Sequence, residues 1–181
     1  MSQNAKKIPD LGNVRPTTSK ILESIGNTLR AELEGARVLD LFAGSGALGK
    51  MALDNGCADL VFVEGHTRVA RELHAKLGKR GRVLIALIPE GLVKLEGSFD
   101  IILADPPYGE AVGPLTVAAL AKSALLKDDG ILVMEHHHKD AYLDNYGDLK
   151  RYKTRRFGET ALTYWAFRPK HEEASEDEAA E

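Results

Sequence analysis

Five short apolar segments, separated by stretches of helical periodicity, constrain the fold of this chain more than any other feature. These predicted strands lie at 37–42, 59–64, 82–88, 99–105 and 130–136. Continuous apolar strands that alternate with helices are typical of a parallel sheet covered on both faces. Two further predicted strands, at 149–157 and 160–167, follow each other without a helix, so one late strand should be antiparallel. The sequence predicts an α/β fold with a mostly parallel sheet.

Helical spacing of apolar residues fills the gaps between these strands. The predicted helices cover 17–33, 46–54, 67–77, 90–95 and 114–123. Thr17 or Thr18 is a suitable N-cap for the first helix. Trp165 lies in an alternating strand and is predicted to be a core residue.

Charge is distributed unevenly along the 181 residues, whose net charge is −3. Residues 171–181 hold six acids and no Lys or Arg, which predicts a disordered tail. The remainder carries 24 basic and 21 acidic side chains, a charge of +3. We expect a polar arm at 1–14 and one domain at 15–170. Basic residues cluster at 79–82 and 150–156, and such clusters can follow phosphates.

No apolar run is long enough to cross a bilayer, and the first ten residues lack the apolar region of a signal peptide. The single cysteine, Cys57, rules out an internal disulfide and is compatible with a reducing cytosol. We therefore expect a cytoplasmic protein without a membrane partner. We also expect it to be a monomer.

A glycine-rich turn follows the first predicted strand. Gly44, Ser45, Gly46 and the residues up to Gly49 match G-x-G-x-x-G, and Glu64 lies twenty residues after Gly44. Glycines permit close backbone approach, a helix N-terminus favours an anionic group, and an acid accepts hydrogen bonds from a ribose. The pattern fits any nucleoside ligand, including a nicotinamide or flavin dinucleotide.

Two details favour S-adenosylmethionine over a dinucleotide. Asp40 stands within the strand, four residues before the first glycine, and Phe42 with Ala43 lengthens the turn. That arrangement suits a ligand without a pyrophosphate and with a cationic amino acid end. The ammonium would lie near Asp40 and the ribose near Glu64.

The sequence Asp105-Pro106-Pro107-Tyr108 ends the fourth predicted strand. Proline donates no backbone hydrogen bond, so this turn presents carbonyl groups. A carboxylate beside a carbonyl can accept both hydrogens of an amine, and the ring of Tyr108 can stack on a planar base. Holding a weakly nucleophilic amine in this way is catalysis by positioning. Asp105 would take the proton as positive charge builds on the nitrogen.

Taken together, "RPTT" (15–18), "LDLFAGSGALG" (39–49), "VFVE" (61–64), "ADPPY" (104–108) and "RFGETALTYW" (156–165) resemble the RsmD-type bacterial methyltransferases. That resemblance implies a class I, Rossmann-like methyltransferase fold with a seven-stranded sheet. It implies methylation of the exocyclic N2 of a guanine in 16S ribosomal RNA, from S-adenosylmethionine, on naked RNA or a small-subunit particle.

The resemblance also implies roles for particular residues. The turn from Asp105 to Tyr108 would be catalytic, and Arg15, Thr17 and Tyr108 would contact the substrate. Cofactor contacts are expected at Asp40, Phe42, Gly44, Ser45, Gly46, Glu64, Gly65 and Ile88, the last packing against the adenine. Members of the family usually carry a longer basic hairpin before the first motif, and only fourteen residues precede Arg15 here.

Other functions stay open at this point. The acceptor could instead be adenine N6 in nucleic acid or a protein glutamine, and the glycine loop alone also suits an NAD(P)-dependent oxidoreductase. The three histidines at 136–138 could suggest a metal. Because neighbouring side chains on an extended segment point to opposite faces, we expect no metal site there.

Overall fold

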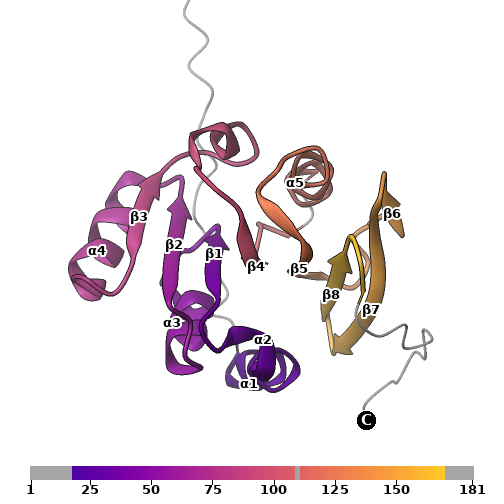
Figure 1. Cartoon of the computed structure of the whole chain (residues 1–181), viewed down its shortest axis with the longest axis horizontal. Helices are drawn as coiled ribbons and strands as arrows, with labels where there is room; N and C mark the ends of the chain where they lie inside the picture. Colours follow the sequence, from indigo (N-terminus) through magenta and orange to yellow (C-terminus); the bar gives the residue numbers. More distant parts are fainter. Residues whose placement is uncertain (1–17, 109–110, 170–181) are drawn as a thin grey trace, which may run out of the picture.

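The computed structural model describes residues 18–108 and 111–169, which form one eight-stranded sheet flanked by helices (Figure 1). The strands are β1 (Arg37–Leu41), β2 (Asp59–Glu64), β3 (Arg82–Ile85), β4 (Phe99–Ala104), β5 (Leu126–His137), β6 (Asn145–Tyr146), β7 (Leu149–Phe157) and β8 (Thr160–Ala166). The helices are α1 (Ser19–Thr28), α2 (Arg30–Leu33), α3 (Ala47–Asp54), α4 (Thr67–Leu77), the 3₁₀ helix η1 (Glu90–Lys94) and α5 (Val112–Leu120).

The strand order is β3-β2-β1-β4-β5-β8-β7-β6. Strands β1 to β5 are mutually parallel, as their apolar pattern predicts, while β8 pairs antiparallel with both β5 and β7. The predictions of seven strands and of a single antiparallel strand are both wrong by one. The additional strand is the two-residue β6, which pairs antiparallel with β7 and is too short to leave a sequence pattern.

Helices cover both faces of the sheet, as predicted (Figure 1). Residues of α1 to α4 pack in one core cluster, and residues of η1 and α5 pack in the other. The first predicted helix is divided at Leu29, although its apolar spacing continues. Its N-cap is Thr18, whose hydroxyl accepts a hydrogen bond from the Ile21 amide at 3.4 Å. Trp165 is fully buried, as predicted.

Within the described residues, no helix is both long and apolar enough to span a membrane. The predicted arm and tail, residues 1–14 and 171–181, lie outside the described part of the chain. Their boundaries stay predictions.

Close packing of α3 on the sheet requires a glycine at position 49. A Cβ there would lie 2.2 Å from Phe62 Cε1 and 2.9 Å from Asp40 Oδ2, and Phe62 is fully buried. We expect Gly49→Ala to lower the free energy of unfolding by about 1–2 kcal/mol, the overpacking cost less the gain in helix propensity. Urea unfolding measures it, with the exposed neighbour Lys50→Ala, expected within about 0.5 kcal/mol of wild type, as control. Equal stability of the two variants would contradict this packing.

Candidate active site

The carboxyl ends of three adjacent strands bring the predicted site residues to one edge of the sheet. Strand β1 lies between β2 and β4, and all three are parallel. Consequently the glycine loop after β1, Glu64 at the end of β2 and Asp105 after β4 are neighbours. Ligands of open α/β sheets bind at this edge.

The glycine loop is held by the carboxylate of Glu64. Glu64 Oε2 accepts from the Gly44 amide at 2.8 Å, and Oε1 accepts from the His66 amide at 2.7 Å. Phe42, Gly44 and Gly46 have φ angles of 60°, 52° and 80°, and a non-glycine residue in that region is strained. Because a carboxylate has about four lone-pair positions, Glu64 keeps acceptor capacity for a ligand.

At the end of β2, Gly65 has no side chain, so the side chain of Leu87 can lie close to its backbone. The sequence did not reveal this contact. A Cβ on Gly65 would lie 2.8 Å from Leu87 Cδ2, and Leu87 is 67% exposed. Ile88 is buried in the core cluster on the η1 and α5 side of the sheet. Ser45 is exposed within the glycine loop. Leu87, which follows β3, therefore presents an apolar side chain to solvent close to Gly65.

Asp40 is buried with 1% of its surface exposed. Its Oδ2 accepts from the Gly49 amide at 2.8 Å, while its buried Oδ1 has no hydrogen-bond partner among the described residues. Burial raises the pKa of Asp40 well above its usual value, and the negative charges of Asp105 and Glu64 raise this pKa further. Three carboxyl groups thus share one electrostatic environment, which favours a cationic guest.

The turn after β4 presents its carboxylate beside the end of β1. The Asp105 amide donates to the Leu41 carbonyl at 3.4 Å, and the Asp105 side chain is half-buried. Pro106 is buried and Pro107 is exposed. The backbone of the turn is thereby attached to the same strand that leads into the glycine loop.

Tyr108 is fixed by residues that sequence reasoning missed. Its hydroxyl lies 3.1 Å from Thr160 Oγ1 and 3.4 Å from Glu135 Oε1, and its ring meets the His137 ring edge-on at 5.9 Å. Burial raises the pKa of Tyr108 to about 12, so the phenol is neutral. The acid at the end of the predicted fifth strand was the available signal for Glu135.

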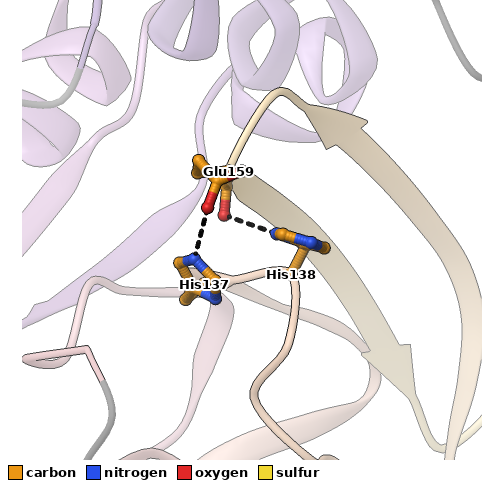
Figure 2. A group of neighbouring side chains, drawn as sticks. All are labelled: His137, His138 and Glu159. Atoms are coloured by element: carbon orange, nitrogen blue, oxygen red, sulfur yellow. Dashed lines mark hydrogen bonds and ion pairs between the residues drawn. The ribbon is translucent and has the colours of Figure 1, made fainter.

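His137, His138 and Glu159 come together beside this tyrosine, from the end of β5 and the turn between β7 and β8 (Figure 2). His136 instead points into the protein, where its Nε2 lies 2.8 Å from Thr163 Oγ1. The expected divergence therefore holds for His136 but is wrong for the other two. Alternation ceases because β5 ends at His137.

Hydrogen bonds within this cluster determine which ring nitrogens of His137 and His138 carry a proton. The Lys139 amide can only donate, so His137 Nδ1 accepts from it at 3.1 Å, and His137 Nε2 carries the proton that it donates to Glu159 Oε2 at 2.9 Å. His138 Nδ1 likewise donates to the Glu159 carbonyl at 3.2 Å. Hydrogen bonding to His137 lowers the pKa of Glu159. These hydrogen bonds join the β7–β8 turn to the end of β5.

Arg15 and Thr17, expected to contact the substrate, lie outside the described residues. Their proposed roles stay predictions.

Known proteins resemble this chain in sequence and in structure. A family model described as "Conserved hypothetical protein 95" matches residues 3–166. The Bacillus subtilis protein named "Putative rRNA methyltransferase YlbH" is 31% identical over 161 residues, which cover 84% of this chain and 88% of the relative. The "Ribosomal RNA small subunit methyltransferase D" of Escherichia coli is 31% identical over 132 residues, covering 71% and 67%. The solved structure titled "Putative methyltransferase yhhF from Escherichia coli" has a TM-score of 0.76 at 25% identity, covering 87% and 90%.

The strand order, with a glycine loop after β1 and an acid at the end of β2, defines a class I methyltransferase fold. Within that class, the chain belongs to the RsmD-type family of rRNA methyltransferases.

The buried carboxyl group of Asp40 makes folding pH-dependent. Because its folded pKa is raised, its contribution to stability is complete below the usual Asp pKa and is lost as pH rises through the folded value. Asp40→Asn can still accept from Gly49 but does not titrate. Its stability relative to wild type should therefore increase as the pH rises above about 4, the usual pKa of an Asp side chain. Urea unfolding along this series tests it, with the exposed Asp54→Asn as control for the lost charge. A stability difference independent of pH would argue against a buried anion.

Proposed function

We propose that this protein transfers a methyl group from S-adenosylmethionine to the exocyclic N2 amine of a guanine in 16S ribosomal RNA. One observation carries the proposal. The carboxyl groups of Asp40, Glu64 and Asp105 lie within electrostatic reach of one another at the strand ends, next to a turn that presents hydrogen-bond acceptors. The first feature suits a cationic methyl donor, and the second suits an amine.

The residues at this edge fit S-adenosylmethionine, whose sulfonium supplies an electrophilic methyl group when it is bound. The buried Asp40 Oδ1, which has no described hydrogen-bond partner, suits the ammonium group. Glu64 would accept from the ribose, the amides at Gly44 and Gly46 would face the ligand carboxylate, and Leu87 would cover the adenine. We retain the other expected contacts as part of the proposal: Phe42, Ser45, Gly65 and Ile88.

A dinucleotide suits the same edge poorly. The pyrophosphate of NAD(P) or a flavin carries two negative charges, and it would lie at the glycine loop. There the negative charge of Asp105 would repel it, because like charges at short range in a partly buried site are unfavourable. The charge of the site thus favours a methyltransferase over an oxidoreductase.

The turn from Asp105 to Tyr108 would hold the target amine. The Asp105 carboxylate and a backbone carbonyl of the turn accept the two N–H groups, which keeps the nitrogen lone pair free to form the new bond to carbon. The N–H bond breaks as positive charge builds on nitrogen, and the proton passes to Asp105 and then to water. Tyr108, held by Thr160 and Glu135, offers its ring to the base.

Membership in the RsmD-type family supports ribosomal RNA as the substrate class and guanine N2 as the acceptor. Adenine N6 and a protein glutamine present the same –NH2 group to the turn and are the alternatives that product analysis separates. An rRNA substrate would place the activity in the cytoplasm. We propose that the protein acts there as a monomer.

The first test identifies the product and the residue that aligns the amine. Wild-type protein, labelled cofactor and undermethylated small-subunit particles should yield N2-methylguanosine after digestion to nucleosides.

Asp105→Ala should lower the transfer rate by at least about 100-fold, the scale of a lost proton acceptor, and should leave cofactor affinity within about twofold. Asp129→Ala, an exposed site at the opposite edge of the sheet, is the matched control. A different methylated nucleoside would overturn the acceptor, and full activity of Asp105→Ala would overturn its role.

The second test concerns the ring of Tyr108. Base stacking on an aromatic ring contributes about 1–3 kcal/mol, so Tyr108→Ala should raise KM for RNA by about 5- to 150-fold. Tyr108→Phe keeps the ring and loses the contacts to Thr160 and Glu135. It should raise KM much less than Tyr108→Ala does. Steady-state kinetics with varied RNA distinguishes the two, and equal KM values for Ala and Phe variants would exclude stacking.

A further inference from the structure

The second half of β7 lies at the same sheet edge as the proposed catalytic turn. Strands β5 and β7 both pair antiparallel with β8, so they run in the same direction. The carboxyl end of β7, at Arg155 to Phe157, therefore lies on the edge where β1, β2 and β4 also end.

The register of β8 also assigns the face. The hydroxyl of Tyr108 contacts Glu135 and Thr160, so it lies on the face to which these side chains point. Glu135 pairs through Leu162 with Arg155, and Thr160 pairs with Phe157. Because residues directly opposite on antiparallel strands share a face, Arg155 and Phe157 lie on the Tyr108 side of the sheet.

A second cation reaches this place from α1. The ammonium of Lys20 lies 5.7 Å from the centre of the Phe157 ring, a cation–π contact, and both Lys20 and Arg155 are exposed. Within the described part of the chain, neither forms an ion pair. We call these two residues the basic rim.

The other basic cluster is arranged differently. Residues 79–82 connect α4 to the start of β3, so they lie at the amino edge of the sheet, away from Tyr108. Arg82 is paired there with Asp59, and at the start of β7 Arg151 is paired with Asp144. The cluster at 79–82 thus lies at the opposite edge of the sheet from Arg155.

We propose that the basic rim, Lys20 and Arg155, binds the phosphate backbone of the RNA strand whose target base lies against Tyr108. This inference rests on the proposed RNA substrate and adds the surface that holds it. Unpaired cations at the same edge and on the same face of the sheet as a stacking ring suit a single-stranded nucleic acid, since phosphate contacts set its position and the ring receives the base.

The test compares two charge reversals of equal size. Lys20→Glu with Arg155→Glu removes the basic rim, and Lys76→Glu with Lys79→Glu, exposed residues near the amino edge, makes the same change in net charge. Affinity for 16S rRNA and for small-subunit particles is measured from about 50 to 200 mM salt. The rim variant should lose about tenfold in affinity near 0.1 M salt, and its slope of log K against log salt should fall by about 1.4–1.8. The control should stay within about twofold of wild type.

Cofactor affinity and the thermal unfolding midpoint are measured for each protein. If the protein with Lys20→Glu and Arg155→Glu does not fold, Lys20→Gln with Arg155→Gln removes the same two contacts. The same decrease in the slope of log K against log salt is then expected. A rim variant with the slope of the control overturns the inference, and so does a wild-type protein that binds neither RNA nor particles. Binding is measured without methyl transfer, so failure of the proposed reaction, recognised as absence of N2-methylguanosine from wild-type assays, is a separate result.

Discussion

Two hydrogen bonds from backbone amides to carboxylates hold the glycine loop on which the site depends. Asp40 accepts from Gly49 and Glu64 accepts from Gly44, both at 2.8 Å. The first bond attaches the start of α3 to the penultimate residue of β1, and the second attaches the loop to the end of β2. Because Gly44 and Gly46 adopt positive φ, the loop can turn sharply between these two anchors. The same two acids lie close to Asp105 at the strand ends, so the residues that shape the loop also belong to the acidic environment that suits a cationic ligand.

Much of this architecture is encoded locally and could be predicted. Apolar runs identify strands β1, β2 and β4, and the polar residues directly after them must meet because parallel strands end at one edge. The N-cap at Thr18 and the burial of Trp165 likewise depend on neighbours in sequence. Predictions of this kind need only the strand direction, which the alternation of strands and helices determines.

Other features depend on register and could not be predicted. Tyr108 is anchored by Glu135 and Thr160, which are 27 and 52 residues away in sequence and become neighbours only through pairing of β5 with β8. The convergence of His137 and His138 on Glu159 follows from where β5 ends, and strand ends are the least determined part of a strand pattern. The break at Leu29 interrupts a helix whose apolar period continues across it, so tertiary packing decides it.

Opposite charges are segregated along one sheet edge, and this segregation matches the two proposed ligands. Acids gather where β1, β2 and β4 end, while Lys20 and Arg155 lie beyond β5, at the end of β7. In the proposed complex a sulfonium cofactor would be drawn to the first region and a phosphate backbone to the second, and each region would repel the other's ligand. Tyr108 stands between them, attached by its hydroxyl to β8. A base against this ring would thus lie between its own backbone and the methyl donor, which is the arrangement that transfer to an exocyclic amine requires.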